Sequence, residues 1–358
     1  MRAFIRVAPD QILVLESLRS LPASPEKAGP SKGLARISRV DFFLSDWQSW
    51  EAPYRLLSPR DFFAELEAPE GAHPNQPGGS DSLVPGTQWE LSPRSGFEAD
   101  FRQIQGMISR GEIDKAVPVV RARSSWVPSS ADFLTKSLRL LRVAQESQIP
   151  FGIWSPQGGV LGLTPEILFT TQDSHLHSMA LAGTQALREG LDPAKALRNP
   201  KDQHEHALVV TDLLKELSPL GVVKKHPTEV LILQKLAHLC TRLELQMTER
   251  TEARQWIKKL HPTAALGIAP RSAGFLRLKE LSLQRERGFF GAPLLLEWED
   301  SSLALVQIRS LFWTRQFSEI WSGCGIVGES QVEAEWSELL LKLNSILHLL
   351  GLDPIPEP

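Results

Sequence analysis

The chain has 358 residues, of which 42% are hydrophobic and 23% are charged, proportions typical of a globular protein with one large domain or two. Its 39 Lys and Arg residues are nearly balanced by 42 Asp and Glu residues, so the net charge of -3 offers no positive field for nucleic acid or an anionic membrane. Residues 1–15 lack the apolar core of a secretory signal, and no segment reaches membrane-spanning length, so we expect a cytoplasmic protein. Two cysteines, Cys240 and Cys324, are too few for a disulfide framework and are expected to be reduced.

Residues 1–96 are predicted to form a smaller, amino-terminal part of the fold. Alternating apolar residues predict short strands over 12–15 and 34–40, and a helical pattern covers 60–66. Pro and Gly crowd among polar residues between 67 and 96, which indicates a connection or flexible flap.

The part of the chain from 97 to 358 carries the informative motifs. Apolar residues at helical spacing predict a helix that begins at Phe97 and ends near Gly111, and a strand follows over 116–120 with Lys115 at its start. Further strands are predicted at 152–154, 159–163, 294–298, 303–308 and 319–323, and helices at 203–217 and 333–350. Paired strands with flanking helices predict an α+β fold.

Near the carboxyl terminus, Glu335, Glu338 and Lys342 are spaced at i, i+3 and i+7, so they project from one face of the predicted helix. Two close carboxylates repel each other unless a cation lies between them, and Mg²⁺ suits such oxygen ligands. The Gly323-Cys324-Gly325 segment just before this helix allows backbone N–H groups to converge on an anion. The alternative is a surface helix with an ordinary Glu/Lys ladder.

Ten short segments occur in a fixed order along the chain. They are Lys115 before a strand, 163–166 (Leu-Thr-Pro-Glu), 181–184 (Leu-Ala-Gly-Thr), Lys201 with 205–206, 238–239, 261–263, Gly267 with 270–271, 287–288 with 291–293, 308–309, and the terminal glycines with their helix. By this series the chain resembles the chorismate-utilising enzymes, which include isochorismate synthases, salicylate synthases and the large subunits of anthranilate and aminodeoxychorismate synthases. The resemblance covers roughly residues 97–350 and makes 97–358 the catalytic part.

The resemblance implies a single large domain of two packed, mainly antiparallel β-sheets flanked by helices, with chorismate bound in the cleft between them. Glu205 and Glu338 would ligate Mg²⁺ with Glu335 close by, and the metal would bind one carboxylate of the substrate. Other residues would bind the rest of the substrate: Arg309 the second carboxylate, aided by the amides of Gly323 and Gly325 and by Lys342, with Thr184 and His238 in the same cavity.

Each of these residues also has an ordinary structural explanation. Glu205 follows Lys201 at i+4, which is typical of an exposed ion pair on a helix. His238 could be a packed, hydrogen-bonded histidine, Arg309 a solvated residue at the edge of a strand, and Glu166 a carboxylate at the start of a strand.

Lys115 indicates which group of chorismate-utilising enzymes this chain resembles. Isochorismate and salicylate synthases have a lysine here that activates water, whereas anthranilate synthases typically have a glutamine and use ammonia. Glu166 would be the general acid that protonates the departing C4 hydroxyl while Lys115 takes a proton from the water that attacks C2. The sequence is therefore interpreted as a Mg²⁺-dependent isochorismate synthase that needs no glutaminase subunit, in either a menaquinone or a siderophore pathway.

Three alternatives remain. A salicylate synthase begins with the same water attack and then eliminates pyruvate, although Phe290, which lacks the hydroxyl found in many relatives, argues mildly against that step. Anthranilate synthase component I is a second alternative, which Lys115 disfavours. The aminodeoxychorismate synthases are set aside, because Ala182 stands where many of them have a nucleophilic lysine. A protein that binds chorismate without turning it over is the alternative of a different class.

Overall fold

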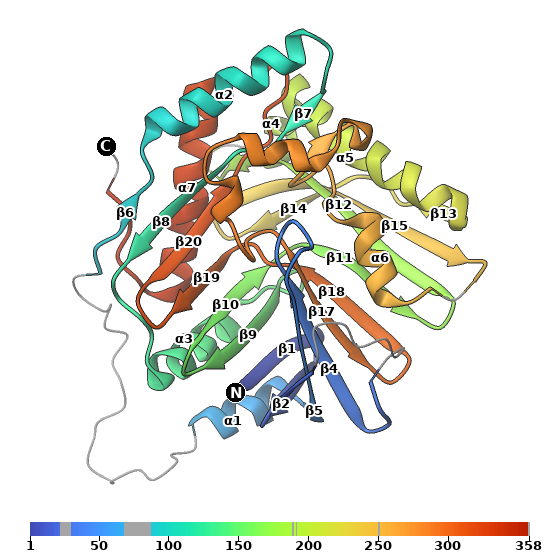
Figure 1. Cartoon of the computed structure of the whole chain (residues 1–358), viewed down its shortest axis with the longest axis vertical. Helices are drawn as coiled ribbons and strands as arrows, with labels where there is room; N and C mark the ends of the chain where they lie inside the picture. Colours follow the sequence, from blue (N-terminus) through green and yellow to red (C-terminus); the bar gives the residue numbers. More distant parts are fainter. Residues whose placement is uncertain (22–29, 68–86, 188–189, 191, 250, 357–358) are drawn as a thin grey trace.

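The computed structural model describes residues 1–21, 30–67, 87–187, 190, 192–249 and 251–356. Its strands form an antiparallel network that has two halves. In Figure 1 the two halves meet near the amino-terminal strands and diverge above them. A separate pair of very short strands lies above them. The α+β class predicted from the sequence is confirmed.

Among the described residues, the first half of the network contains eight strands. In spatial order they are β6 (Glu90–Leu91), β8 (Val119–Ser124), β20 (Ser318–Gly323), β19 (Ser310–Thr314), β10 (Gly158–Thr164), β9 (Ile149–Ser155), β1 (Arg2–Ala8) and β2 (Gln11–Glu16). Strand β1 pairs with β9, so the amino-terminal strands belong to the same sheet as strands from the middle and the end of the chain.

The second half contains β4 (Leu34–Val40), β17 (Pro293–Trp298), β18 (Ser301–Val306), β11 (Ile167–Gln172), β12 (His175–Ala186) and β15 (Leu236–Met247) in spatial order. Two further strands, β13 (Gly221–Lys225) and β14 (Glu229–Leu233), both pair with β15. The pairing of β12 with β15 is long, and both strands reach the site described below.

Strand β5 (Trp47–Leu57) joins the two halves. Its first part pairs with β4 and with the short β3 (Arg19–Ser20), while its last residues, from Tyr54 onward, pair with β2. The expectation of two packed sheets is therefore corrected in one respect: β5 is shared between them, and the strand network is continuous. Sequence periodicity could not show this, because a strand that changes partners midway keeps the same alternation.

The halves still pack against each other as predicted. Ile5 and Leu13 of the first half share an apolar cluster with Ile37, Leu294 and Leu305 of the second, and all five side chains are almost completely buried. Burial of such side chains contributes roughly 1.5–3 kcal/mol each.

Helices cover the outer surfaces of the network. They are α1 (Pro59–Glu67), α2 (Arg94–Ser109), α3 (Ser130–Val143), α4 (Pro193–Ala196), α5 (Pro200–Leu217), α6 (Ala253–Leu260) and α7 (Val332–Leu350), with 3-10 turns at Ser218–Leu220, Arg271–Ala273, Phe275–Glu280 and Gln284–Glu286. Helix α7 packs on β20 and α3, whereas α5 packs on β12 and β15. The helices predicted at 60–66, 203–217 and 333–350 are thus present.

The strand predicted over 116–120 is interrupted. Lys115–Ala116 form β7, which pairs with β16 (Ile268–Ala269), and the chain resumes pairing only in β8. Pro118 lies in the gap and has no backbone N–H to donate to a neighbouring strand. The break places Lys115 in a different sheet from β8.

Most of the Pro- and Gly-rich stretch predicted at 67–96 lies outside the described residues, at 68–86. Its last residues form β6 and the start of α2. The division of the chain into 1–96 and 97–358 stays a prediction. Cys240 and Cys324 are buried free thiols, as expected. None of the helices in the described ranges is long and apolar enough to cross a membrane.

Candidate active site

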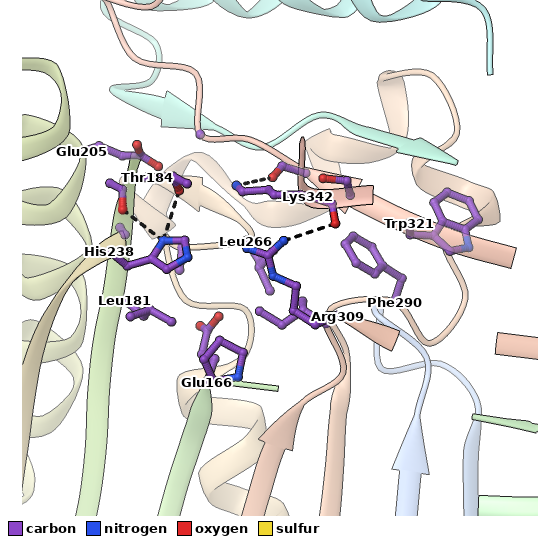
Figure 2. Close-up of a pocket in the computed structure, with 18 residues that line it drawn as sticks. Glu166, Leu181, Thr184, Glu205, His238, Leu266, Phe290, Arg309, Trp321 and Lys342 are labelled. Carbon is purple, nitrogen blue, oxygen red and sulfur yellow. Dashed lines mark hydrogen bonds between the residues drawn. The ribbon is translucent and has the colours of Figure 1, made fainter. Parts of the chain in front are cut away.

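A pocket opens where strands from both halves end (Figure 2). The first half contributes residues of β20, and the second half contributes residues of β12 and β15. Its lining comprises Pro165, Glu166, Leu181, Ala182, Gly183, Thr184, Glu205, His238, Ala265, Leu266, Phe290, Ile308, Arg309, Trp321, Ser322, Gly323, Gly325 and Lys342. Eight of the eleven predicted site residues therefore lie in one wall or another of a single cavity.

Lys115 and Glu205 form a buried ion pair at one side of this pocket. Lys115 Nζ lies 3.0 Å from Glu205 Oε1, and the lysine side chain has no exposed surface. Glu205, from α5, lines the pocket, while Lys115 lies behind it. Burial opposes ionisation of Glu205, but Lys115 and Lys201 more than offset this and lower its pKa to about 2. Lys115, the predicted base, is therefore held next to the cavity by its contact with Glu205, and the Glu205 side chain lines the cavity.

Gly325 gives this ion pair its space. The segment around it is fixed beside β7, because Ala116 and Ile326 exchange two backbone hydrogen bonds. A Cβ atom on Gly325 would overlap Glu205 Oε1 and Lys115 Cε. Neither Gly323 nor Gly325 adopts a positive φ, so these glycines are required for close approach and not for a left-handed turn.

We expect Gly325→Ala to disrupt the pair and lower stability. The added methyl group must displace the Lys115 or Glu205 side chain, and overpacking of this kind typically costs about 1–3 kcal/mol. Urea unfolding would measure the loss, together with a fall in turnover. Gly328→Ala is the matched control, because the nearest atom to its added Cβ is Ile108 Cγ2 at 3.9 Å. Equal stability of the two variants would contradict the proposed role of Gly325.

Three carboxylates meet near the junction of α5 and α7, but lysine side chains lie among them. Lys201 Nζ is 2.9 Å from Glu335 Oε1 and 3.5 Å from Glu205 Oε2. Glu338 Oε1 is 2.6 Å from Lys342 Nζ, which also donates to Gly323 O over 2.9 Å. Within the described ranges, no group of three or more His, Cys, Asp or Glu side chains is arranged to hold a metal ion. The Lys201–Glu205 pair expected on an exposed helix surface exists, but both of its side chains are largely buried.

Glu166 lies at the opposite side of the cavity from Glu205 in the view of Figure 2. It connects β10 to β11, and its backbone is fixed because its N–H donates to Thr164 Oγ1 and its carbonyl accepts from Val306 N. The side chain is buried, and this burial raises its pKa to about 7, against the opposing effects of Lys115 and Lys342. Glu166 therefore retains a proton at neutral pH in a substantial fraction of molecules, as a general acid requires.

His238 presents a neutral ring to the cavity. Burial lowers its pKa to about 3, and Nδ1 lies 3.1 Å from Gly183 O and 3.2 Å from Thr184 Oγ1. Since a carbonyl only accepts, Nδ1 carries the hydrogen and Nε2 is an acceptor, and Nε2 has no partner in the described part of the chain. Gly183 adopts φ +72° at a bulge between β12 and β15, which aligns Thr184 opposite His238.

Arg309 lies between β18 and β19 in a left-handed conformation with φ +53°. Its carbonyl accepts from Leu163 N. In the described part of the chain its Nη1 makes only long contacts, 3.4 Å to Ser345 Oγ and 3.5 Å to Lys342 O. Burial lowers the pKa of Arg309 to about 10, so the guanidinium is still charged at neutral pH. Arg309 is not a solvated edge residue: it lines the pocket beside Lys342.

Sequence reasoning missed part of the site. Lys201 belongs to the motif series and precedes Glu205 by one helical turn, but its contact with Glu335 joins residues 134 positions apart, which no local pattern reveals. Leu266 and Trp321, which complete the apolar wall beside Phe290, were not predicted; Phe290 stacks on Trp321 with ring centroids 6.1 Å apart. Three predicted residues, Lys115, Glu335 and Glu338, do not line the main pocket.

Residues 67–351 match the family model described as chorismate binding enzyme. This range covers most of the chain and includes every site residue named above. The chain belongs to the chorismate-binding enzyme family.

Several named proteins are similar to this family member. It is 30% identical over 275 residues to the salicylate biosynthesis isochorismate synthase of Pseudomonas aeruginosa, which covers 74% of this chain and 57% of that protein. It is 28% identical to the isochorismate synthase MenF of Bacillus subtilis, over 60% of this chain and 47% of that protein. The chain thus spans about half the length of these curated relatives. The isochorismate synthase EntC of Escherichia coli (strain K12) is 28% identical over 86% of this chain and 76% of that protein.

Solved structures support the fold. The menaquinone-specific isochorismate synthase MenF of Escherichia coli aligns with a TM-score of 0.77 at 19% identity, over 98% of this chain and 88% of that one. Anthranilate synthase component I of Streptococcus pneumoniae aligns with a TM-score of 0.75 at 16% identity, over 97% of this chain and 92% of that one. Enzymes named for different products thus share this fold, and the fold does not determine the product.

The carboxylates of this chorismate-binding enzyme are chemically suited to a hard divalent cation. Glu205 and Glu335 face the same ammonium of Lys201, so a small cation between them would meet oxygens from both. Glu335 Oε2 is buried without a hydrogen-bond partner in the described structure, which leaves an acceptor available. Glu205 and Glu335 therefore suit a metal ion once the Lys201 ammonium has moved out from between them.

Proposed function

We propose that this protein is a Mg²⁺-dependent isochorismate synthase, which converts chorismate to isochorismate by attack of water at C2 and loss of the C4 hydroxyl. The observation that carries the proposal is the pair of groups on opposite sides of the pocket: Glu166, which is protonated in a substantial fraction of molecules, on one side, and Lys115 behind Glu205 on the other. The names of three of the relatives described above, each an isochorismate synthase, support the same activity.

The proton transfers balance between these two residues. Lys115, which must first release the proton of its ion pair with Glu205, takes a proton from water as the water oxygen bonds to C2, the ring double bonds shift, and the C4–O bond breaks. Glu166 gives its proton to the departing hydroxyl, so one water enters and one leaves. When bound, Mg²⁺ would hold a substrate carboxylate and offset its charge.

The remaining predicted residues would orient the substrate. Arg309 and Lys342 place two cationic groups near one wall, and the long contacts of Arg309 leave its fork available to a carboxylate. On the facing wall, His238 Nε2 is an acceptor suited to a substrate hydroxyl, with Thr184 beside it. Gly323 and Gly325 let the substrate approach the backbone.

A salicylate synthase is the second candidate, because the same water attack would precede elimination of pyruvate. Phe290 lines the pocket and offers no hydroxyl to that second step, which favours release of isochorismate. Anthranilate formation would need ammonia, and we expect no glutaminase subunit to supply it.

Product analysis tests the proposal. The purified protein is incubated with chorismate and Mg²⁺, with and without ammonia and with an EDTA control, and products are separated by liquid chromatography. We expect isochorismate in a reversible mixture with chorismate, and no product in EDTA. Salicylate with pyruvate would indicate the second candidate, anthranilate that depends on ammonia would show that Lys115 has been misinterpreted, and binding without turnover would indicate a non-catalytic protein.

A further inference from the structure

Lys201 lies where the two helices of the carboxylate cluster face each other. It projects from the first turn of α5, and its ammonium contacts Glu205 on its own helix and Glu335 on α7. A contact with Asp202 is longer, at 3.9 Å. Burial alone would lower the pKa of Lys201, but Glu205, Glu338 and Glu335 raise it well above its ordinary value. The contacts with Glu205 and Glu335 place this positive charge between two carboxylates.

Lysine side chains offset most of the carboxylate charge of the cluster without any added ion. Three glutamates, Glu205, Glu335 and Glu338, face three lysines, Lys115, Lys201 and Lys342. With all six groups ionised their formal charges sum to zero, and Asp202, 3.9 Å from Lys201, adds one negative charge when it is ionised. A divalent cation added to this set would meet repulsion from nearby ammonium groups, unless one of them moves away.

Lys201 is the lysine placed to move. Lys115 has no exposed surface, and Lys342 is held by both Glu338 and the carbonyl of Gly323. Lys201 retains 20% side-chain exposure and lines a second cavity beside the main pocket, together with Glu335 and Glu338. The two cavities share Thr184. A long, flexible side chain can rotate into this second cavity without unfolding α5.

We propose that Lys201 is a built-in cation that holds Glu205 and Glu335 together in the metal-free protein and competes with the divalent cation for the same carboxylates. The α5–α7 contact is thereby maintained before metal arrives. The cost is a weaker affinity for the metal, because each binding event must displace the ammonium. This inference rests on the metal site of the proposed function.

Metal binding to Lys201→Met tests the proposal. Methionine preserves much of the length of the side chain and removes its charge. We expect Mn²⁺, followed by its electron paramagnetic resonance signal in the absence of substrate, to bind roughly tenfold to a hundredfold more tightly than to the wild type. The metal-free variant should have a lower Tm, and Mg²⁺ should restore more of it than in the wild type.

Two further variants make the result specific. Lys215→Met removes the same charge from an exposed position on α5 and should leave metal affinity unchanged. Lys201→Arg retains the charge and should bind Mn²⁺ no more tightly than the wild type. If Lys201→Met binds Mn²⁺ with wild-type or weaker affinity, the competition does not exist, while the proposed function stands. If neither protein binds Mn²⁺ with or without chorismate, the metal site and this proposal both fail.

Discussion

Lys115→Gln is expected to abolish most of the conversion of chorismate while leaving the fold and substrate binding intact. Removal of a general base typically lowers turnover by about 10²–10⁴-fold. Glutamine is preferable to alanine here, because its amide can still donate to Glu205, whereas alanine would leave a void beside a buried carboxylate. The loss should therefore reflect the missing amine and not a collapsed site.

Two measurements separate these effects. Turnover is followed by liquid chromatography, and chorismate binding by quenching of tryptophan fluorescence, since Trp321 lines the pocket. Lys258→Gln, at an exposed position on α6, is the control and should match the wild type. Undiminished turnover by Lys115→Gln would remove Lys115 from the mechanism. Loss of binding together with turnover would instead assign Lys115 to the positioning of Glu205.

Local features of the fold, such as the face of a helix or the end of a strand, were predicted well where the chemistry of one residue determines them. The i, i+3 spacing of Glu335 and Glu338 placed them on one face of the predicted helix, and Pro118 marked the interruption between β7 and β8. The motifs also brought Glu166, His238 and Arg309 to a single pocket, as the resemblance implied.

Features that depend on long-range contacts were not predictable. The dual pairing of β5 with β2 and β4 leaves no trace in its alternation. The contact of Lys201 with Glu335 forms only when α5 and α7 pack, so the sequence suggested a simple i, i+4 pair. Some motif residues proved to stabilise the fold and not the site: Arg287 is buried over the ring of Phe42, with its guanidinium carbon 3.4 Å from the ring centroid.

Glu166→Gln is expected to make the protein less active and more stable at alkaline pH. The glutamine cannot protonate the C4 hydroxyl, so turnover should fall by about 10²–10⁴-fold. In the wild type, turnover should decline as the pH rises through about 7, because the acid form of Glu166 is then lost. The variant should lack this decline in its residual activity, and an unaltered pH profile in the variant would exclude Glu166 as the acid.

The stability effect follows from where the proton is held. The pKa of Glu166 is raised from 4.5 to about 7 by burial, so the folded state binds this proton more tightly than the unfolded state. The stabilisation is fully present below about pH 4.5 and is lost as the pH rises through about 7. At pH 8 the wild type therefore buries an ionised carboxylate at a cost of up to about 3 kcal/mol relative to acid pH. Glutamine has no such cost, because it stays neutral.

Denaturant unfolding of both proteins at pH 5 and pH 8 would measure this difference. We expect Glu166→Gln to gain free energy of unfolding relative to the wild type between the two pH values, while Glu249→Gln, at an exposed position, shows no such gain. The gain should shrink when a ligand with cationic groups fills the pocket, since a cation near Glu166 would stabilise its ionised form. A variant that loses activity without gaining stability at pH 8 would mean that the Glu166 carboxylate is already ionised at neutral pH, and the general acid would have to be sought elsewhere in the pocket. A buried carboxyl group whose ionisation destabilises the folded protein is typical of an active site that uses its proton.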